Sequence, residues 1–263
     1  MSFLKRHLAP LSAAAWEEID QEARNALTAR LAARRFVDVI GPLGFDASSV
    51  NLGRLSDWGT TDDGAQYALR QVQPLVEVKV PFVVSRNELE HLERGASDVE
   101  LDAVSEAARI VSRFEERAVH HGAETAQIKG LVEASTHEPV ELGDDISAFP
   151  DRVTRALIRL TDAGVEGPYV LVLGERHFAA VAGHVSAYPM RQQLTKLLGM
   201  EPAYSPGLDH ALLVSTRGGD FELTLGADMS IGFDRVLGDE VHLFLGETFT
   251  FRVTGGEAVI VLR

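Results

Sequence analysis

The sequence predicts an α+β fold in which helices and strands are interleaved. Segments in which apolar residues recur at helical spacing alternate with short β-branched runs, and the part after residue 211 is mostly β. No internal repeat or low-complexity linker interrupts this pattern. The length of 263 residues, with 45% hydrophobic and 24% charged residues, corresponds to one large domain or two that pack closely together.

The composition excludes several classes of site and partner. No cysteine is present, so thiolate zinc sites, iron–sulfur clusters, cysteine nucleophiles and disulfides are excluded. The net charge of −14 argues against a nucleic-acid binder, because such a protein needs a positive surface. No apolar run approaches about 18 residues, so we expect neither a membrane span nor a secretory signal.

The first predicted element is a helix over residues 12–35, with Ser12 as its N-cap. One face carries Trp16, Ile19, Ala23, Leu27 and Leu31 at helical spacing. A β-branched run at residues 36–40 predicts a strand, and the Gly-Pro-rich stretch 41–44 predicts the turn that ends it.

Residues 48–84 predict a long hairpin with arms at 50–58 and 67–84 and a polar tip at 59–64. Pro74 and Pro81 place the second arm at an edge or in an irregular position. A long two-stranded arm is only marginally stable alone in water. Two interpretations remain: the hairpin packs on another molecule, or it folds back on its own domain.

The sequence predicts five further helices and five further strands. The expected helices cover residues 85–95 (opened by the capping box Ser85-Arg86-Asn87-Glu88), 98–121, 151–163, 175–185 and 190–198. The expected strands cover residues 169–173, 211–215, 221–225, 241–253 and 258–262. The helix at 98–121, ended by Gly122, is expected to bury Val104, Ala107, Ala108, Val111, Phe114 and Ala118.

No motif for catalysis or phosphate binding is present, so an enzymatic site is not expected. The best candidate for a metal site is His120-His121, with Glu116 and Glu124 four residues to either side of His120. Neighbouring helical residues point about 100° apart, so we expect no metal and interpret the pair as a solvated helix end. Glu115-Glu116 and Asp144-Asp145 are interpreted as solvated charge pairs, and Gly218-Gly219 as a hairpin turn.

Short segments along the whole chain carry a resemblance to a known family. They are Leu4-Lys5-Arg6 with Leu8-Ala9-Pro10, Trp16-x-x-Ile19, Phe36-Val37-Asp38-Val39 with Gly41-Pro42, Ser85-Arg86-Asn87-Glu88 with Glu93-Arg94-Gly95, Gly164-Val165-Glu166-Gly167-Pro168-Tyr169, Arg217-Gly218-Gly219-Asp220-Phe221, Ser230-Ile231-Gly232 and Glu247-Thr248-Phe249-Thr250-Phe251. In this order and spacing they resemble the encapsulins, the shell proteins of prokaryotic protein nanocompartments.

The resemblance implies the Hong Kong 97-type phage capsid fold, with a peripheral domain, an axial domain and an extended loop. Carried over by position, residues 1–47 would form the N-terminal luminal helix and the start of the peripheral domain, and 48–82 the extended loop. Residues 83–130 would form the peripheral domain with its spine helix, and 131–224 the axial domain. Residues 225–254 would return to the peripheral domain, and 255–263 would add the last strand to the axial domain.

The resemblance also implies a function. Such proteins assemble with copies of themselves into closed icosahedral shells, commonly of about 60 subunits, in the cytoplasm of a bacterium or archaeon. The shell encloses a cargo enzyme, such as a dye-decolorising peroxidase or a ferritin-like protein, through a C-terminal peptide of the cargo. The alternatives are a prophage-type capsid protein, or an enzyme of the bacteriocin or protease kind with which relatives have been labelled.

The site residues follow by position from the same resemblance. The cargo peptide would bind at Leu27, Leu31, Arg34, Asp38, Ile231 and Phe233. A fivefold pore would be lined by His184, Ser186 and Tyr188. Asn87 stands where some members hold a flavin beside a tryptophan, and the loss of that stacking surface argues against flavin. No cofactor, metal, nucleic acid or membrane is expected.

Overall fold

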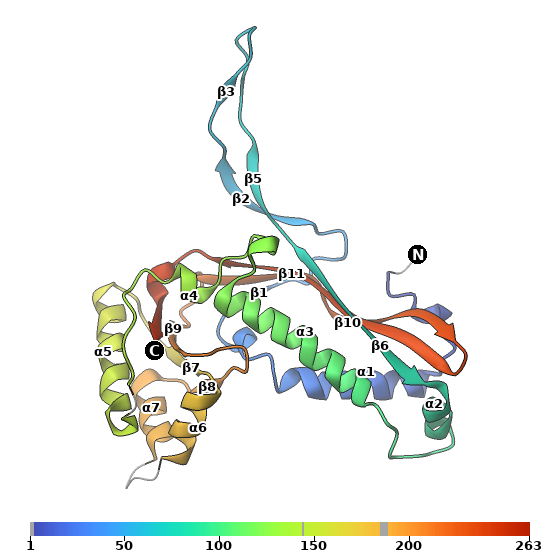
Figure 1. Ribbon diagram of the computed structural model, residues 1–263. Coiled ribbons are helices and arrows are strands. Elements are labelled where there is room, and N and C mark those ends of the chain that lie inside the picture. Colours follow the sequence, from blue (N-terminus) through green and yellow to red (C-terminus); the bar gives the residue numbers. More distant parts are fainter. Residues whose placement is uncertain (1–2, 144, 185–188) are drawn as a thin grey trace.

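The computed structural model describes residues 3–143, 145–184 and 189–263, which form two four-stranded sheets. The larger sheet runs along the body, and the smaller one occupies the end that holds the C-terminus (Figure 1). The larger sheet has the order β1 (Asp38–Ile40), β10 (Phe221–Leu237), β11 (Glu240–Val253) and β6 (Val76–Ser85). The smaller has the order β12 (Val259–Leu262), β9 (Ala211–Ser215), β7 (Tyr169–Leu173) and β8 (Ala203–Tyr204). Helices and strands are interleaved, so the predicted α+β class is confirmed.

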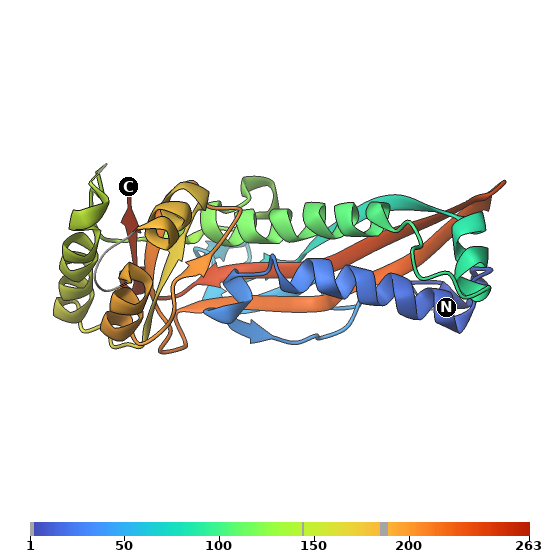
Figure 2. The same ribbon diagram turned by 90° about the horizontal axis from the view of Figure 1, so that it is seen from below.

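Two long helices, α1 (Ala13–Thr28) and α3 (Asp102–His121), pack side by side on one face of the larger sheet (Figure 2). The short helix α2 (Arg86–Glu93) closes the far end. Small and branched side chains form their shared core, which is why the two helices approach closely. The buried members include Ala15, Ile19 and Ala23 from α1, Val104, Ala107, Ala108 and Val111 from α3, and Phe82, Ile231 and Leu243 from the sheet.

The smaller sheet is covered by α5 (Phe149–Asp162), α6 (Glu175–Gly183) and α7 (Met190–Leu198), with the short helix α4 (Leu131–Ala134) beside α3. Every residue of β9 and β12 is buried. Strands buried on both faces consist of continuous apolar runs, and this is the pattern that predicted them from the sequence. The strand Tyr169–Leu173 lies where it was predicted.

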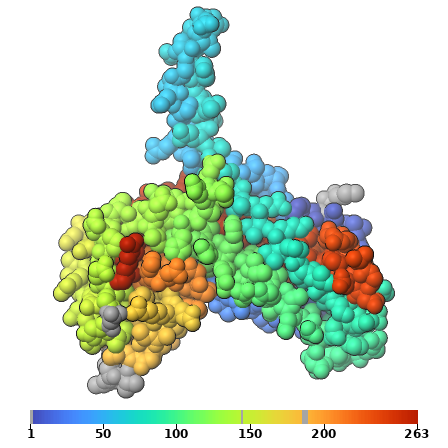
Figure 3. All heavy atoms as spheres, viewed as in Figure 1, coloured from blue at the N-terminus to red at the C-terminus, as the bar shows by residue number. Residues whose placement is uncertain are grey.

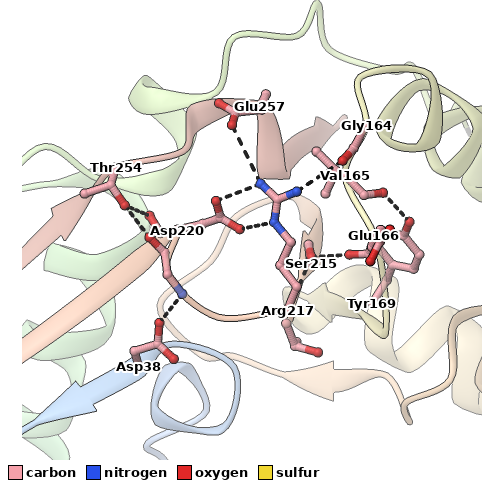
Figure 4. Close-up of polar contacts among 12 residues, drawn as sticks. Asp38, Gly164, Val165, Glu166, Tyr169, Ser215, Arg217, Asp220, Thr254 and Glu257 are labelled. Carbon is pink, nitrogen blue, oxygen red and sulfur yellow. Dashed lines mark hydrogen bonds and ion pairs between the residues drawn. The ribbon is translucent and has the colours of Figure 1, made fainter.

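Arg217 joins the two sheets where the chain passes from β9 to β10 (Figure 4). Its guanidinium donates to both carboxylate oxygens of Asp220 at 2.8 and 2.9 Å, donates to the Gly164 carbonyl at 3.2 Å and lies 3.7 Å from Glu257. Gly218 and Gly219 have φ of +85° and +84°. Their turn connects strands of different sheets, so the predicted hairpin turn at this place is wrong.

The hairpin at residues 48–75 stands clear of the body (Figure 3). It consists of β2 (Ser49–Leu55) paired with β5 (Arg70–Pro74), and a tip of β3 (Gly59–Thr60) paired with β4 (Gln66–Tyr67). At its base, the side chain of Gln73 donates to the carbonyls of Gln127 and Phe251. The interpretation in which the hairpin folds back on its own domain is therefore wrong.

The predicted second arm at residues 67–84 divides into separate strands at Leu75. Beyond that residue the chain continues as β6, which pairs with β11 and forms an edge of the larger sheet. Pro81 lies in this edge strand, where a missing N–H is tolerated. The prolines thus indicate the edge correctly, but half of the predicted arm belongs to the body.

Several predicted boundaries differ from the structure. Strand β10 continues to Leu237, whereas it was expected to end at residue 225, so the expected domain boundary at 224 falls inside one strand. Irregular pairing with β11 between Leu225 and Ser230 disturbs the alternation of apolar and polar residues there. Helix α3 begins at Asp102 and not at residue 98, and Ser85 precedes α2 without a side-chain capping hydrogen bond.

Candidate functional site

A groove of about 440 Å³ lies between α1 and the middle of β10. Leu27 and Leu31 form one wall, and Ile231 and Leu245 contribute apolar surface from the sheet. Charged and polar side chains complete the lining: Arg6, Asp20, Arg24, Arg34, Asp228 and Ser230. A surface of this kind, apolar in part with a few charged groups, has the composition usual for a binding site.

The end of α1 shapes this groove. The helix ends at Thr28, seven residues before the predicted end, and the N–H of Leu31 then donates to the carbonyl of Leu27. The two leucines therefore stay on one side of the turn and are each half-buried. On the opposite side, the N–H of Phe233 donates to the carbonyl of Leu4, which brings the N-terminal segment to the groove.

Four of the six residues expected to bind the cargo peptide line the groove, namely Leu27, Leu31, Arg34 and Ile231. Asp38 does not, because its carboxylate accepts the N–H of Gly219 at 2.6 Å in the joint between the sheets. Phe233 does not line it either, and its ring packs in the core formed by α1, α3 and the sheet. Arg34 and Asp38 therefore do not meet in the groove.

Arg34 instead binds three carboxylates at the end of the groove. Its guanidinium donates to both oxygens of Glu115 at 2.6 to 3.1 Å, to Asp228 at 2.8 Å and to Glu247 at 2.6 Å. The side chains of Glu115 and Glu247 are fully buried, whereas Asp228 is half-exposed. One cation thus faces three acids, and this excess of acidic groups favours the retention of a proton.

The pKa values in this cluster follow from that geometry. Burial raises the pKa of Glu247 well above its ordinary value, and the charge of Glu115 and a hydrogen bond with it raise it further. The opposing effect of Arg34 is smaller. Burial alone would lower the pKa of Arg34, but its hydrogen bonds and ion pairs, chiefly with Glu115, raise it. Arg34 therefore stays charged, and Glu247 keeps a proton to a higher pH than an exposed carboxyl group does.

A second buried polar cluster lies one residue further along α3. Glu116 accepts the N–H of Ala33 at 2.7 Å and the hydroxyl of Ser205 at 2.6 Å, and Nε2 of His120 lies 2.9 Å from the same hydroxyl. Glu116 and His120 are both fully buried. The interpretation of His120-His121 as a solvated helix end and of Glu115-Glu116 as a solvated pair is therefore wrong.

The sequence contained a signal for these buried acids. Glu115 continues the spacing of Val104, Ala108 and Val111 on the buried face of α3. Phe114, which was expected in that core, is 37% exposed.

Among the residues that the structure describes, no group of three or more His, Asp or Glu side chains is arranged to hold a metal.

The other expected site residues lie elsewhere. His184 follows α6 and is partly buried, whereas Ser186 and Tyr188 lie outside the described residues. Asn87 is exposed in the first turn of α2 and does not line the groove. No helix in the described part of the chain is both long and apolar enough to cross a membrane.

Comparison with known proteins connects this architecture to a family. Residues 1–250 match the family described as encapsulating protein for peroxidase. The chain is 47% identical over its whole length to the type 1 encapsulin shell protein of Rhodospirillum rubrum, covering 97% of that protein.

Solved structures with low sequence identity share the fold. The virus-like particle from Pyrococcus furiosus matches with a TM-score of 0.69 and 14% identity, over 94% of this chain and 99% of the other. The capsid of Myoviridae phage XM1 matches with a TM-score of 0.56 and 14% identity, over 88% and 91% of the two chains. The chain therefore belongs to the encapsulin shell proteins and has the Hong Kong 97-type fold of phage capsid proteins.

Proposed function

We propose that this chain is the shell subunit of an icosahedral nanocompartment that encloses a cargo enzyme and binds it through a C-terminal peptide. The hairpin carries the first part of this proposal. Its exposed apolar side chains have no cover from the body of the subunit, as the exposures of Trp58 (64%) and Leu69 (72%) illustrate. Neighbouring copies would supply that cover and remove the apolar surface from water.

The groove beside α1 carries the second part. Leu27, Leu31 and Ile231 offer apolar contacts to a peptide, and the charged residues around them offer hydrogen bonds to its backbone. The guanidinium of Arg34 is already paired with three carboxylates. The groove would therefore recognise a peptide chiefly through apolar side chains. The description of the matching family favours a peroxidase over a ferritin-like protein as the cargo.

The comparisons also bear on the alternatives. Full-length similarity to an encapsulin shell protein favours a nanocompartment over a prophage capsid. We propose a structural subunit without enzymatic activity, located in the cytoplasm and operating without a flavin. His184 remains a proposed pore residue.

Replacing Leu31 by Asp tests the proposal. We expect the variant to form particles of normal diameter with little cargo, because a carboxylate replaces a side chain whose burial is worth roughly 1.5–3 kcal/mol. Capture of a cargo tail should fall about tenfold or more. The measurement is gel filtration and negative-stain microscopy of shells co-expressed with a tailed peroxidase, followed by quantification of the peroxidase in the particles.

Leu237→Asp is the matched control, since Leu237 is 62% exposed at the end of β10 and outside the groove. Its particles should contain the normal amount of cargo. A normal cargo load in Leu31→Asp shells would contradict the groove assignment, and loss of folding would show that Leu31 serves the core. A wild-type protein that stays monomeric at micromolar concentration would contradict the shell itself.

A further inference from the structure

A second cavity of about 350 Å³ lies where the end of α1, the outer face of α3 and the segment after β8 meet. It shares no lining residue with the groove. Arg30, Arg109 and Arg113 line it together with Ala29, Tyr204 and Pro206. Three arginine side chains thus line one cavity of a chain whose net charge is −14.

One acidic side chain, Glu106, is paired with this group of arginines in the described part of the chain. Both nitrogens of the Arg109 fork bind the carboxylate of Glu106, one of them at 2.6 Å. The hydrogen bond from Arg109 lowers the pKa of this carboxylate, and the positive charges of Arg109, Arg113 and Arg30 lower it further. Arg30 donates to the carbonyl of Ala26 at 2.6 Å, and among the described residues it forms no ion pair.

Arg113 has no hydrogen-bond or ion-pair partner within the described ranges of the chain. It follows Arg109 by one helical turn, and like charges at this spacing destabilise a helix. One carboxylate against three guanidiniums leaves a local charge of about +2, which an added anion would neutralise.

We propose that this cavity is a binding site for a small molecule bearing a diphosphate or similar multiply charged phosphate group. Arginine forks bind phosphate oxygens in pairs, and charge-assisted hydrogen bonds of this kind are among the strongest in proteins. The cavity lies at the lower end of the volumes usual for small-molecule sites. Tyr204, which is 37% exposed, offers a ring face or a hydroxyl to the rest of the ligand. The site does not depend on the cargo groove.

Calorimetric titration of the purified, full-length protein with inorganic pyrophosphate tests the site. We expect binding that weakens as salt is added, because the contacts are ionic. In Arg113→Ala the binding should be about tenfold weaker or more, which is the usual effect of losing a hydrogen bond to a charged group. Because Arg113 is exposed and unpaired, this variant should keep its fold and particle size.

Arg117→Ala is the matched control. Arg117 is an exposed arginine one turn further along the same helix, and it does not line the cavity. It should bind pyrophosphate like the wild type. Absence of binding to the wild-type protein, or an equal loss in both variants, would overturn the proposal. Citrate that binds as tightly as pyrophosphate would overturn the assignment to phosphate.

Discussion

Arg34 shows how a charged group is accommodated inside a mainly apolar subunit. Its three carboxylate partners come from α3, β10 and β11, so a single guanidinium connects three elements. Glu247 is fully buried, and its Oε2 atom accepts no hydrogen bond from the described residues. An ionised carboxylate in that position is costly, which is why the pKa of Glu247 lies above its ordinary value.

The raised pKa of Glu247 predicts how stability changes with pH. The folded state holds a proton there more tightly than the unfolded state does. This stabilisation is complete below the ordinary carboxyl pKa and is lost as pH rises through the folded value. Each unit between the two pKa values corresponds to about 1.4 kcal/mol. Glu247→Gln keeps an oxygen for Arg34 but has no proton to lose, so its stability should change less between pH 5 and 9.

Urea unfolding at a series of pH values measures this difference. Glu133→Gln is the control, because that side chain is 67% exposed and its pH dependence should match the wild type. Parallel pH profiles for Glu247→Gln and the wild type would contradict the proton assignment.

For individual residues, the sequence predicts part of the groove beside α1. Leu27 and Leu31 can be placed because apolar residues at helical spacing share a face, whereas the family resemblance supplies their role and the place of Ile231. The partners of Arg34 cannot be found in the same way. Glu247 and Asp228 are distant from it in sequence, and only the packing of α3 against the sheet brings the four side chains together.

The end of α3 illustrates what decides an element boundary. Gly122 has a φ of +81°, and a Cβ at this position would lie 2.6 Å from the carbonyl oxygen of Ile128. Glycine is required here for two reasons, the left-handed backbone and the close approach of the 128–130 segment. The sequence predicts this helix end correctly, because glycine after a run of apolar periodicity is a common stop signal.

Gly122→Ala should therefore destabilise the subunit by more than the backbone strain alone, which is about 1 kcal/mol. Gly164→Ala is the matched control, since Gly164 has a φ of +75° but no atom within 4 Å of the added Cβ. Urea unfolding at equal protein concentration compares the two. Equal losses of stability in both variants would show that the contact with Ile128 contributes nothing.

Other boundaries depend on long-range contacts and are less predictable. The sequence extends the first helix through Leu31 and beyond, because its apolar spacing continues. In the structure, Glu116 binds the N–H of Ala33 and Glu115 binds Arg34, and the chain leaves the helix after Thr28 to reach them. The contacts of Glu115 and Glu116 thus end the first helix earlier than its apolar spacing predicts.

At the scale of the whole molecule, the hairpin stands apart from the packed body of the subunit. Its strands pair with each other and contact the body only near Gln73 in the described part of the chain. The hydrophobic cores do not include it. The sequence predicts this arm from its turn residues and prolines, but not the joint at Arg217, whose partners are scattered along the chain.

Replacing residues 53–68 by an Asn-Gly turn should leave the subunit folded and abolish regular shells. The helical content measured by circular dichroism should stay near the wild-type value, while gel filtration should show small species in place of particles. Asp62→Ser changes only the polar tip and should assemble normally. Normal particles from the shortened chain would contradict the assignment of this arm to contacts between subunits.

The exposed arm also has a consequence for the fate of subunits in a cell. Before neighbours cover it, the arm offers an extended backbone and uncovered apolar side chains such as Trp58 and Leu69. Proteases cleave, and chaperones bind, segments of this kind far more readily than a packed core. We expect a subunit without neighbours to be degraded more readily than one whose arm is covered in a shell. The arm that would join subunits would thus also favour the removal of subunits that remain unassembled.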